Sequence, residues 1–174
     1  MRWFHTIAFV FSLSLAVAGV AGCTNPFAPR LDEKLSPVSS TLGDPRTVQG
    51  IFQNIQYAYT YRDTLIYGNL LHPEYRFEYY NSDRDADMRF LRDEEMRVTN
   101  NLFKGADQID LQWNDIISQD GDSVLTNVTR NYNLKIVLPG NEVFRIDGRA
   151  RLRLVRETPE QAWLIKIWYD ASNS

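Results

Sequence analysis

The fold is decided by residues 124–136, VLTNVTRNYNLKI, together with the stretch FRIDGRARLRL at residues 144–154. In both stretches mostly apolar side chains occupy every second position, and polar side chains occupy most of the positions between them. A period of two is typical of a β-strand with one buried face, because successive side chains point to opposite faces. The segment Pro139-Gly140-Asn141 between the stretches has the composition of a turn. The sequence therefore predicts a hairpin of two long strands.

Shorter strands are predicted on either side of this hairpin. IDLQW (109–113) alternates before it, and WLIKIWY (163–169) alternates after it. Residues 120–122 (DGD) and 158–160 (TPE) are turn segments between these strands. Long strands joined in this way predict an antiparallel meander with helices packed on one face.

The segment that precedes the strands is predicted to be helical. Asp44 is a favoured N-cap, and Pro45 suits the first helical position. Apolar residues then recur at helical spacing in a single stripe, which comprises Val48, Ile51, Phe52, Ile55 and Tyr59. Gly50 weakens a helix by about 1 kcal/mol relative to Ala, so we expect close packing at this position.

Two further helices complete the predicted elements. Arg62-Asp63 indicates a bend, and a second, shorter helix ends at His72-Pro73, because the residue before a proline avoids helical geometry. Residues 75–79 alternate as a first strand, and residues 81–93 form a polar, charged stretch. A third helix, with Asp93 as its cap, ends at Gly105.

This order of elements resembles the NTF2-like (cystatin-like cone) superfamily. The resemblance is carried by IQYAY (55–59) leading to LLHPEYRF (70–77), by RDEE (92–95) through NLF (101–103), and by WLIKIW (163–168). It implies an α+β fold in which a curved antiparallel β-sheet packs against about three N-terminal helices and encloses a cone-shaped cavity. The superfamily includes isomerases, dehydratases and transport adaptors, so the fold alone does not give the function.

Composition restricts the classes of partner. The net charge of −3 gives no overall positive field, so we expect no nucleic-acid binding. The chain has one cysteine, Cys23, which excludes an internal disulfide. Nine Tyr, nine Phe and four Trp supply enough large side chains for the core of a small domain.

The N-terminus has the pattern of an export signal. Arg2 is followed by an apolar run over residues 6–20, which is shorter than the roughly 20 residues of a membrane-spanning helix. The run ends in Val20-Ala21-Gly22-Cys23, which resembles the lipobox of bacterial lipoproteins. In that class the thiol carries a diacylglyceryl group, and cleavage occurs just before the cysteine. The resemblance implies that residues 1–22 are a lipoprotein signal peptide and that the lipid on Cys23 binds a membrane.

A linker is predicted to follow. Residues 23–43 are rich in proline and serine, a composition that favours a flexible, extended chain, and residues 44–174 would form the NTF2-like domain. We expect the protein to lie in the cell envelope. Thr24 stands where aspartate would favour retention in the inner membrane, so a Gram-negative source would place it on the outer membrane, facing the periplasm.

Catalytic and metal sites are not expected. His72 is the only histidine of the domain and the one candidate for acid–base chemistry, but it lies beside Pro73 at a helix end. Residues 83–94 resemble an EF-hand calcium loop, yet Met88 replaces the glycine of its sharp turn, and two arginines add positive charge. We predict no catalytic residue, no metal and no cofactor.

The strands offer two candidate binding surfaces. Arg145, Arg149, Arg151 and Arg153 share one strand face, which we interpret as a solvated face paired with neighbouring acids. Aromatic residues with polar tips are predicted to line the cone as ligand-binding residues; they are Trp113, Tyr132, Trp168 and Tyr169.

Three functions remain open at this point. The first is a membrane-anchored, non-enzymatic envelope lipoprotein that binds a protein or a small apolar ligand. The second is an NTF2-like enzyme of the isomerase or dehydratase type that uses His72. The third is a structural or assembly component of the envelope that forms a homodimer through its sheet. The lining of the cone distinguishes them, because a cone filled by side chains favours the third.

Overall fold

The computed structural model describes residues 42–81 and 85–171, which form three helices and six strands. The helices are α2 (Val48–Tyr61), α3 (Thr64–Leu70) and α4 (Arg92–Gly105). The strands are β1 (Leu71–Asn81), β2 (Ala86–Leu91), β3 (Gln108–Gly121), β4 (Leu125–Leu138), β5 (Glu142–Val155) and β6 (Leu164–Asp170). The predicted signal peptide, Cys23 and most of the predicted linker lie outside the described residues. No helix in the described ranges is long and apolar enough to cross a membrane.

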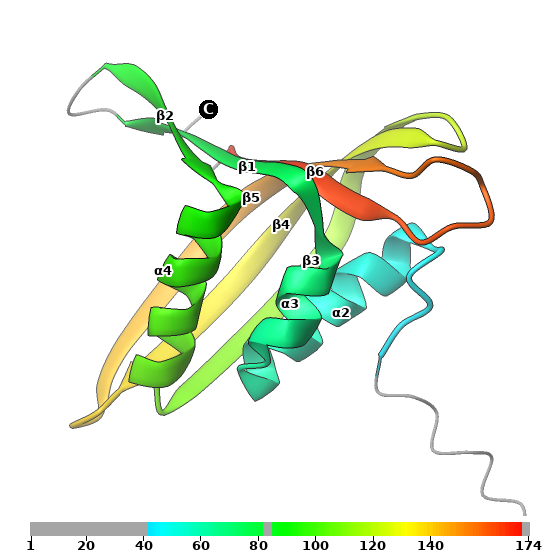
Figure 1. Ribbon diagram of the computed structural model, residues 1–174. Coiled ribbons are helices and arrows are strands. Elements are labelled where there is room, and N and C mark those ends of the chain that lie inside the picture. Colours follow the sequence, from blue (N-terminus) through cyan, green and yellow to red (C-terminus); the bar gives the residue numbers. More distant parts are fainter. Residues whose placement is uncertain (1–41, 82–84, 172–174) are drawn as a thin grey trace, which may run out of the picture. The chain divides into compact units, whose positions relative to one another are not determined.

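The strands form one curved sheet in the order β2-β1-β6-β5-β4-β3, with the helices on its concave side (Figure 1). The predicted meander is confirmed from β3 to β6, where each strand pairs antiparallel with the next. The β1–β2 pair is also antiparallel, whereas β1 and β6 pair in parallel. That parallel pairing was not predicted, because it joins segments from opposite ends of the domain. The α+β class and the curved sheet are as predicted.

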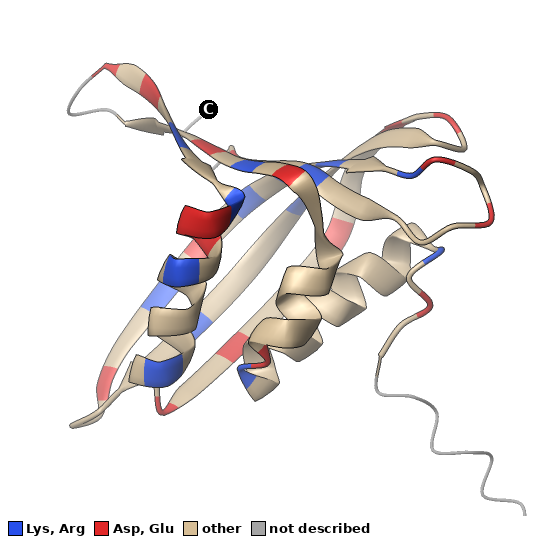
Figure 2. Ribbon diagram, in the orientation of Figure 1, with Lys and Arg blue, Asp and Glu red and all other residues tan. Residues whose placement is uncertain are grey.

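The three helices cover the concave face because each has an apolar side. No charged residue occurs within α2 or α3, and both helices are therefore tan between their ends in Figure 2. Helix α2 buries Ile51, Phe52, Ile55 and Ala58 completely. Those side chains meet the buried alternate residues of the strands, such as Leu152 on β5. The core therefore lies between the helices and the concave face.

The first helix begins three residues later than predicted. Thr47, not Asp44, is the N-cap of α2, and its Oγ1 accepts a hydrogen bond from the amide of Gly50 at 2.9 Å. Pro45 lies in a turn before the helix and not at its first position. In this turn the Asp44 carboxylate forms an ion pair with the Arg46 guanidinium at 2.8 Å. The expected close packing at Gly50 is confirmed: a Cβ atom there would lie 1.9 Å from the Asp44 carbonyl oxygen.

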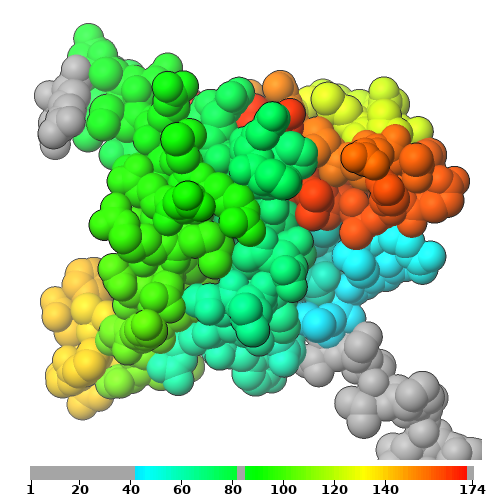
Figure 3. Space-filling view, viewed as in Figure 1, coloured from blue at the N-terminus to red at the C-terminus, as the bar shows by residue number. Residues whose placement is uncertain are grey.

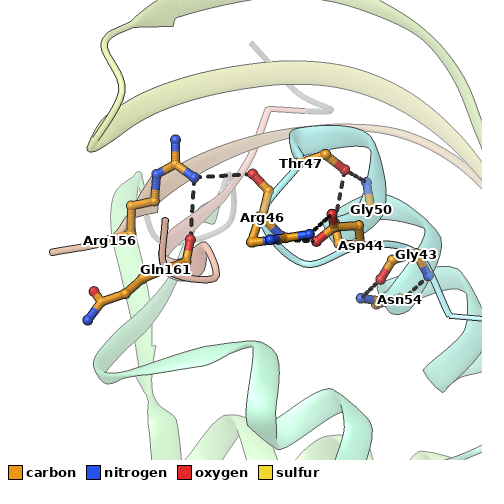
Figure 4. A network of polar contacts seen from close by, with 8 residues as sticks. All are labelled: Gly43, Asp44, Arg46, Thr47, Gly50, Asn54, Arg156 and Gln161. Atoms are coloured by element: carbon orange, nitrogen blue, oxygen red, sulfur yellow. Dashed lines mark hydrogen bonds and ion pairs between the residues drawn. The ribbon is translucent and has the colours of Figure 1, made fainter. Parts of the chain in front are cut away.

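Side-chain and backbone contacts fix this N-terminal turn to the rest of the domain (Figure 4). The amide nitrogen and carbonyl oxygen of Gly43 both bind the side chain of Asn54, at 2.7 and 3.0 Å. One nitrogen of the Arg156 guanidinium donates to the carbonyls of Arg46 and Gln161, at 3.2 and 3.3 Å. The chain is therefore held in place before α2 begins.

The polar stretch over residues 81–93 contains a strand that was not predicted. Residues 86–91 form β2, which pairs with the outer part of β1 from Arg76↔Leu91 to Asn81↔Ala86. Residues 86–90 (ADMRF) alternate between half-buried apolar and exposed charged side chains, so the sequence carries a strand pattern, which the high charge of the surrounding stretch obscured. Helix α4 follows directly with Leu91 as its N-cap and no side-chain cap, so the predicted capping role of Asp93 is wrong.

Candidate functional site

An aromatic cluster lies on the concave face and brings together three of the four predicted ligand-binding residues. The Trp113 ring is 5.7 Å from the Tyr132 ring and 6.0 Å from the Trp168 ring, measured between centroids. The Phe52 ring of α2 packs edge-on against Trp113 at 4.8 Å. The rings therefore fill this part of the cone. Whether they bind a ligand stays a prediction.

Tyr132 owes its position to a glycine on the neighbouring strand. Gly148 is its register partner on β5, and a Cβ atom at Gly148 would lie 2.3 Å from Cζ of the Tyr132 ring. The phenol ring therefore lies against the bare backbone of β5. Any larger residue at this position would force the ring to move.

Tyr169 lies apart from the other three. It pairs in register with Arg151 and Glu78, whose side chains are on the outer face of the sheet. There it lines a small cavity of about 190 Å³ together with Arg151 and Arg153. Strand alternation explains the separation, because the neighbouring residue Trp168 points to the concave face.

Arg130 is a nearly buried cation that packs against α2, and sequence reasoning missed it. It lies on the concave side of β4, is 9% exposed, and places its guanidinium 4.9 Å from the centre of the Phe52 ring. The side chain donates to the Asn114 carbonyl and, at 3.0 Å, to Oε1 of Gln49. The signal was present, since Arg130 is a cation in the inward-facing row of residues 124–136.

A buried carboxyl group lies at the other side of the core, on α4. Glu95 is 8% exposed and its Oε1 accepts hydrogen bonds from the Tyr67 hydroxyl at 2.7 Å and the Thr99 hydroxyl at 3.2 Å. Burial raises the pKa of the Glu95 carboxyl above its ordinary value, against the opposing effect of both hydrogen bonds. The sequence had indicated only that the negative charge of Glu95 is favourable in the first turn of a helix, and not that the side chain is buried.

Tyrosines surround this carboxyl group. Burial raises the pKa of Tyr67 and Tyr75 well above the ordinary value, so both hydroxyls stay protonated. Tyr59 packs on Tyr67 and Phe103 with ring centroids 5.6 and 5.2 Å away. The Tyr75 hydroxyl has no hydrogen-bond partner within the described part of the chain. The group resembles a hydrogen-bonded core more than an open site, since each of Tyr67, Tyr75 and Glu95 is almost wholly buried.

His72 lies away from both groups. It is the second residue of β1, half-buried, and its Nδ1 accepts a hydrogen bond from the Glu74 amide at 3.0 Å. Glu74 in turn pairs with Lys166 at the surface. The structure therefore does not bring His72 together with Glu95 in the cone.

The calcium-like stretch is divided between different elements. Residues 86–91 belong to β2 and Glu94 to α4, while Asp83 lies outside the described residues. A strand cannot wrap around an ion as an EF-hand loop does. Within the described ranges, no group of three or more His, Cys, Asp or Glu side chains is arranged to hold a metal ion.

The arginines of β5 lie on the outer face, but asparagines bind two of them. Arg149 donates to Oδ1 of Asn131 and Arg153 to Oδ1 of Asn127, each at 3.1 Å. These bonds form a polar ladder between β4 and β5, and the expected pairing with neighbouring acids stays a prediction. A shallow polar cavity of about 380 Å³ adjoins this ladder beside Asn131 and Asn133.

Among the described residues, no strand pairs with the edge of the N-terminal part of β5 that faces away from β4; we call this part, residues 142–148, the free half of β5. Strand β6 pairs with β5 only from Ala150 onward, whereas β4 pairs with all of it. Three large apolar side chains of this segment are 42–46% exposed, namely Val143, Phe144 and Ile146. In Figure 3 this end of the β4–β5 hairpin (gold) projects beyond α4 (green). Sequence alternation predicted these positions but not their exposure.

Comparisons with known proteins identify the fold. No protein-family model and no curated protein sequence matches the chain. A candidate scytalone dehydratase from Novosphingobium aromaticivorans superposes with a TM-score of 0.63 at 11% identity, over 74% of this chain and 83% of that one. A candidate aromatic ring hydroxylase from the same organism gives 0.62 at 11% identity, over 75% and 90%. An NTF2-like superfamily protein from Salmonella enterica gives 0.56 at 13% identity, over 71% and 87%. These identities show shared architecture alone, and the domain has the NTF2-like fold.

Proposed function

We propose that the chain is a lipid-anchored structural or assembly component of the cell envelope, without enzymatic activity, that acts by contact with another protein through the free half of β5. The observation that carries this proposal is the contrast between the two parts of the concave side. Packed aromatic rings fill the cone, whereas apolar side chains on the free half of β5 face solvent. Exposed apolar surface of this kind is typical of interaction sites.

The lipid anchor is supported by the sequence alone. The apolar run, the small residues before Cys23 and the single cysteine fit lipidation, and two or three acyl chains hold a protein stably on a membrane. We expect the mature chain to begin at acylated Cys23, which intact mass after membrane extraction would establish. Cys23→Ser should release the protein from the membrane fraction, with Thr24→Ser as a matched control. Retention of Cys23→Ser in that fraction would contradict the anchor.

The contact surface can be tested by photocrosslinking in intact cells of the source organism. A photoreactive residue at Ile146 should yield a discrete crosslinked protein. The control is the same residue at Leu65 on α3, which is 78% exposed but lies outside the free half of β5. Equal products from both positions, or none from Ile146, would contradict the proposal.

A small apolar ligand is the second candidate for what the domain binds. Nε1 of Trp113 is buried and has no hydrogen-bond partner within the described part of the chain. Such a donor could bind an acceptor atom of an aromatic ligand that displaces part of the ring cluster. Titration with an anilinonaphthalene dye, followed by tryptophan fluorescence, would test this. A dye response in the wild type that is lost in Trp113→Phe would favour a ligand site over protein contact.

Enzymatic activity would have to rest on Glu95 rather than on His72. A buried carboxyl group with a raised pKa is the usual form of a general acid or base. On our account Glu95 is structural, so Glu95→Gln should leave any envelope phenotype unchanged. Loss of the phenotype in a folded Glu95→Gln protein would favour the enzyme instead.

The pH dependence of stability tests the state of Glu95. Because its folded pKa lies above the unfolded value, the folded state binds the proton more tightly. Its contribution is therefore fully present below pH 4.5 and is lost as the pH rises through the folded pKa. Relative to the wild type, Glu95→Gln should gain stability as the pH rises from about 4 to 8. Urea unfolding at each pH measures this, and a constant difference would contradict the buried charge.

A further inference from the structure

A small pocket lies on the outer face of the sheet, on the side opposite the cone, and has a volume of about 190 Å³. Because β6 lies between β1 and β5, Ile167 and Tyr169 of β6 line its centre. Arg151 and Arg153 of β5 line one side, and Glu78 of β1 lines the other. The pocket thus combines an apolar and aromatic centre with a charged rim.

The register shows how the pocket lies relative to the end of the described chain. Ile167 pairs with Arg153, and further along β6 the Ala171 amide binds the Arg149 carbonyl at 2.7 Å. The chain from Ile167 to Ala171 therefore runs along β5 away from Arg153. Ile167 and Arg153 mark the end of the pocket that is farther from the terminus.

The two arginines of the pocket lack acids directly opposite them. Unlike charges that face each other across two strands stabilise a sheet. On β4, however, the register partners of Arg151 and Arg153 are Thr129 and Asn127, and on β6 they are the two residues at the centre of the pocket. Within the described ranges neither arginine forms an ion pair. Both positive charges are therefore available to a ligand.

The guanidinium of Arg153 is also held in position. Its Nε donates to Oδ1 of Asn127 at 3.1 Å, which leaves the two terminal nitrogens for a ligand. The planar fork of these nitrogens matches two oxygens of a carboxylate or phosphate. Two acids lie nearby, and each has a partner of its own. Glu78 forms an ion pair with Arg76 at 2.7 Å, and Asp120 accepts a hydrogen bond from Nδ2 of Asn127 at 3.1 Å.

We propose that this pocket binds a small organic anion, with a carboxylate or phosphate group at Arg151 and Arg153 and an apolar body against Ile167 and Tyr169. Apolar walls with a few placed polar groups are the usual composition of a ligand site. The volume is below the roughly 300–1,000 Å³ of pockets for drug-sized ligands, so the ligand is about the size of one ring. The net charge of −3 disfavours a broad anionic surface as the partner. This site does not depend on the contact proposed for the free half of β5.

The experiment is an NMR titration of the full chain in a mild non-ionic detergent, with benzoate and phenyl phosphate as probes. Each probe should shift the methyl signals of Ile167 and the amide signal of Tyr169 in a saturable way. Arg151→Gln and Arg153→Gln should each raise the dissociation constant roughly tenfold, because each removes a charged donor. Arg145→Gln is the matched control and should change nothing, since Arg145 lies on the same face of β5 but outside this pocket.

Each outcome decides the proposal. Saturable binding that both pocket variants weaken, and that Arg145→Gln does not, supports the site. Benzamide has the shape of benzoate without its charge, so equal binding of benzamide would overturn the recognition of an anion. Equal weakening by Arg145→Gln would overturn the pocket in favour of general attraction to the arginine face. No shift at Ile167 from either probe at up to about 10 mM would overturn it as well. The unchanged remainder of each variant's spectrum checks that the variant is folded.

Discussion

The two halves of β5 have the same sequence pattern and different surroundings. Leu152 and Leu154 in the C-terminal half are completely buried, between β4 and β6 and beneath the helices. Phe144 and Ile146 in the free half point to the same face, yet each is more than 40% exposed. The two halves differ in their neighbours, because among the described residues β6 pairs with β5 only from Ala150 to Val155. Alternation thus predicts which face is apolar, but the length of the neighbouring elements decides whether it is covered.

The largest expected effect is in the covered half. Leu152→Ala removes a completely buried side chain and should lower the free energy of unfolding by about 2–5 kcal/mol, because a cavity remains in the core. Urea unfolding of the dilute protein measures this. A loss below about 1 kcal/mol would mean that the core between sheet and helices is less tightly packed than described.

An intermediate effect is expected where the two halves meet. Gly148→Ala places a methyl group against the Tyr132 ring, which has to move, so we expect a loss of about 1–3 kcal/mol. Combining it with Tyr132→Ala removes the clash. The double variant should then lose less than the sum of the two single losses, as thermal unfolding of all three proteins would reveal. Strict additivity would show that the ring does not rest on Gly148.

The smallest effect on folding is expected in the free half. Ile146→Ala changes a side chain that is 42% exposed, so the unfolding free energy of the dilute protein should change by no more than about 0.5 kcal/mol. A loss close to that of Leu152→Ala would remove the contrast between the halves, because it would show that Ile146 is covered within a single chain.

Much of the fold could be predicted from local patterns. The long strands, the three helices and the bend at Arg62-Asp63 follow from periodicity and from proline and glycine positions. The parallel β1–β6 pair depends on a distant part of the chain and left no such pattern. Strand β2 and the N-cap Thr47 are local features that were misread: residues 86–90 do alternate, and Thr47 caps the helix through the nearby Gly50 amide.

The candidate sites were less predictable than the fold. Trp113, Tyr132 and Trp168 meet as expected because alternation assigns each to one face, but the same rule separates Tyr169 from them. The sequence indicated that Glu95 is a solvated residue in the first turn of a helix. Its burial could not be predicted, because it depends on contact with Tyr67 from another helix. The exposure of the free half of β5 could not be predicted, because it depends on how far along β5 the pairing with β6 extends.

Amide hydrogen exchange along β5 tests the contrast between its two halves most directly. The amides of Arg151 and Arg153 point toward β6, whereas those of Arg145 and Asp147 point to the edge that no described strand covers. In dilute purified protein we therefore expect slow exchange at positions 151 and 153 and rapid exchange at positions 145 and 147. Slow exchange at positions 145 and 147 in a monomeric sample would contradict the account, because it would show that a single chain covers the free half of β5.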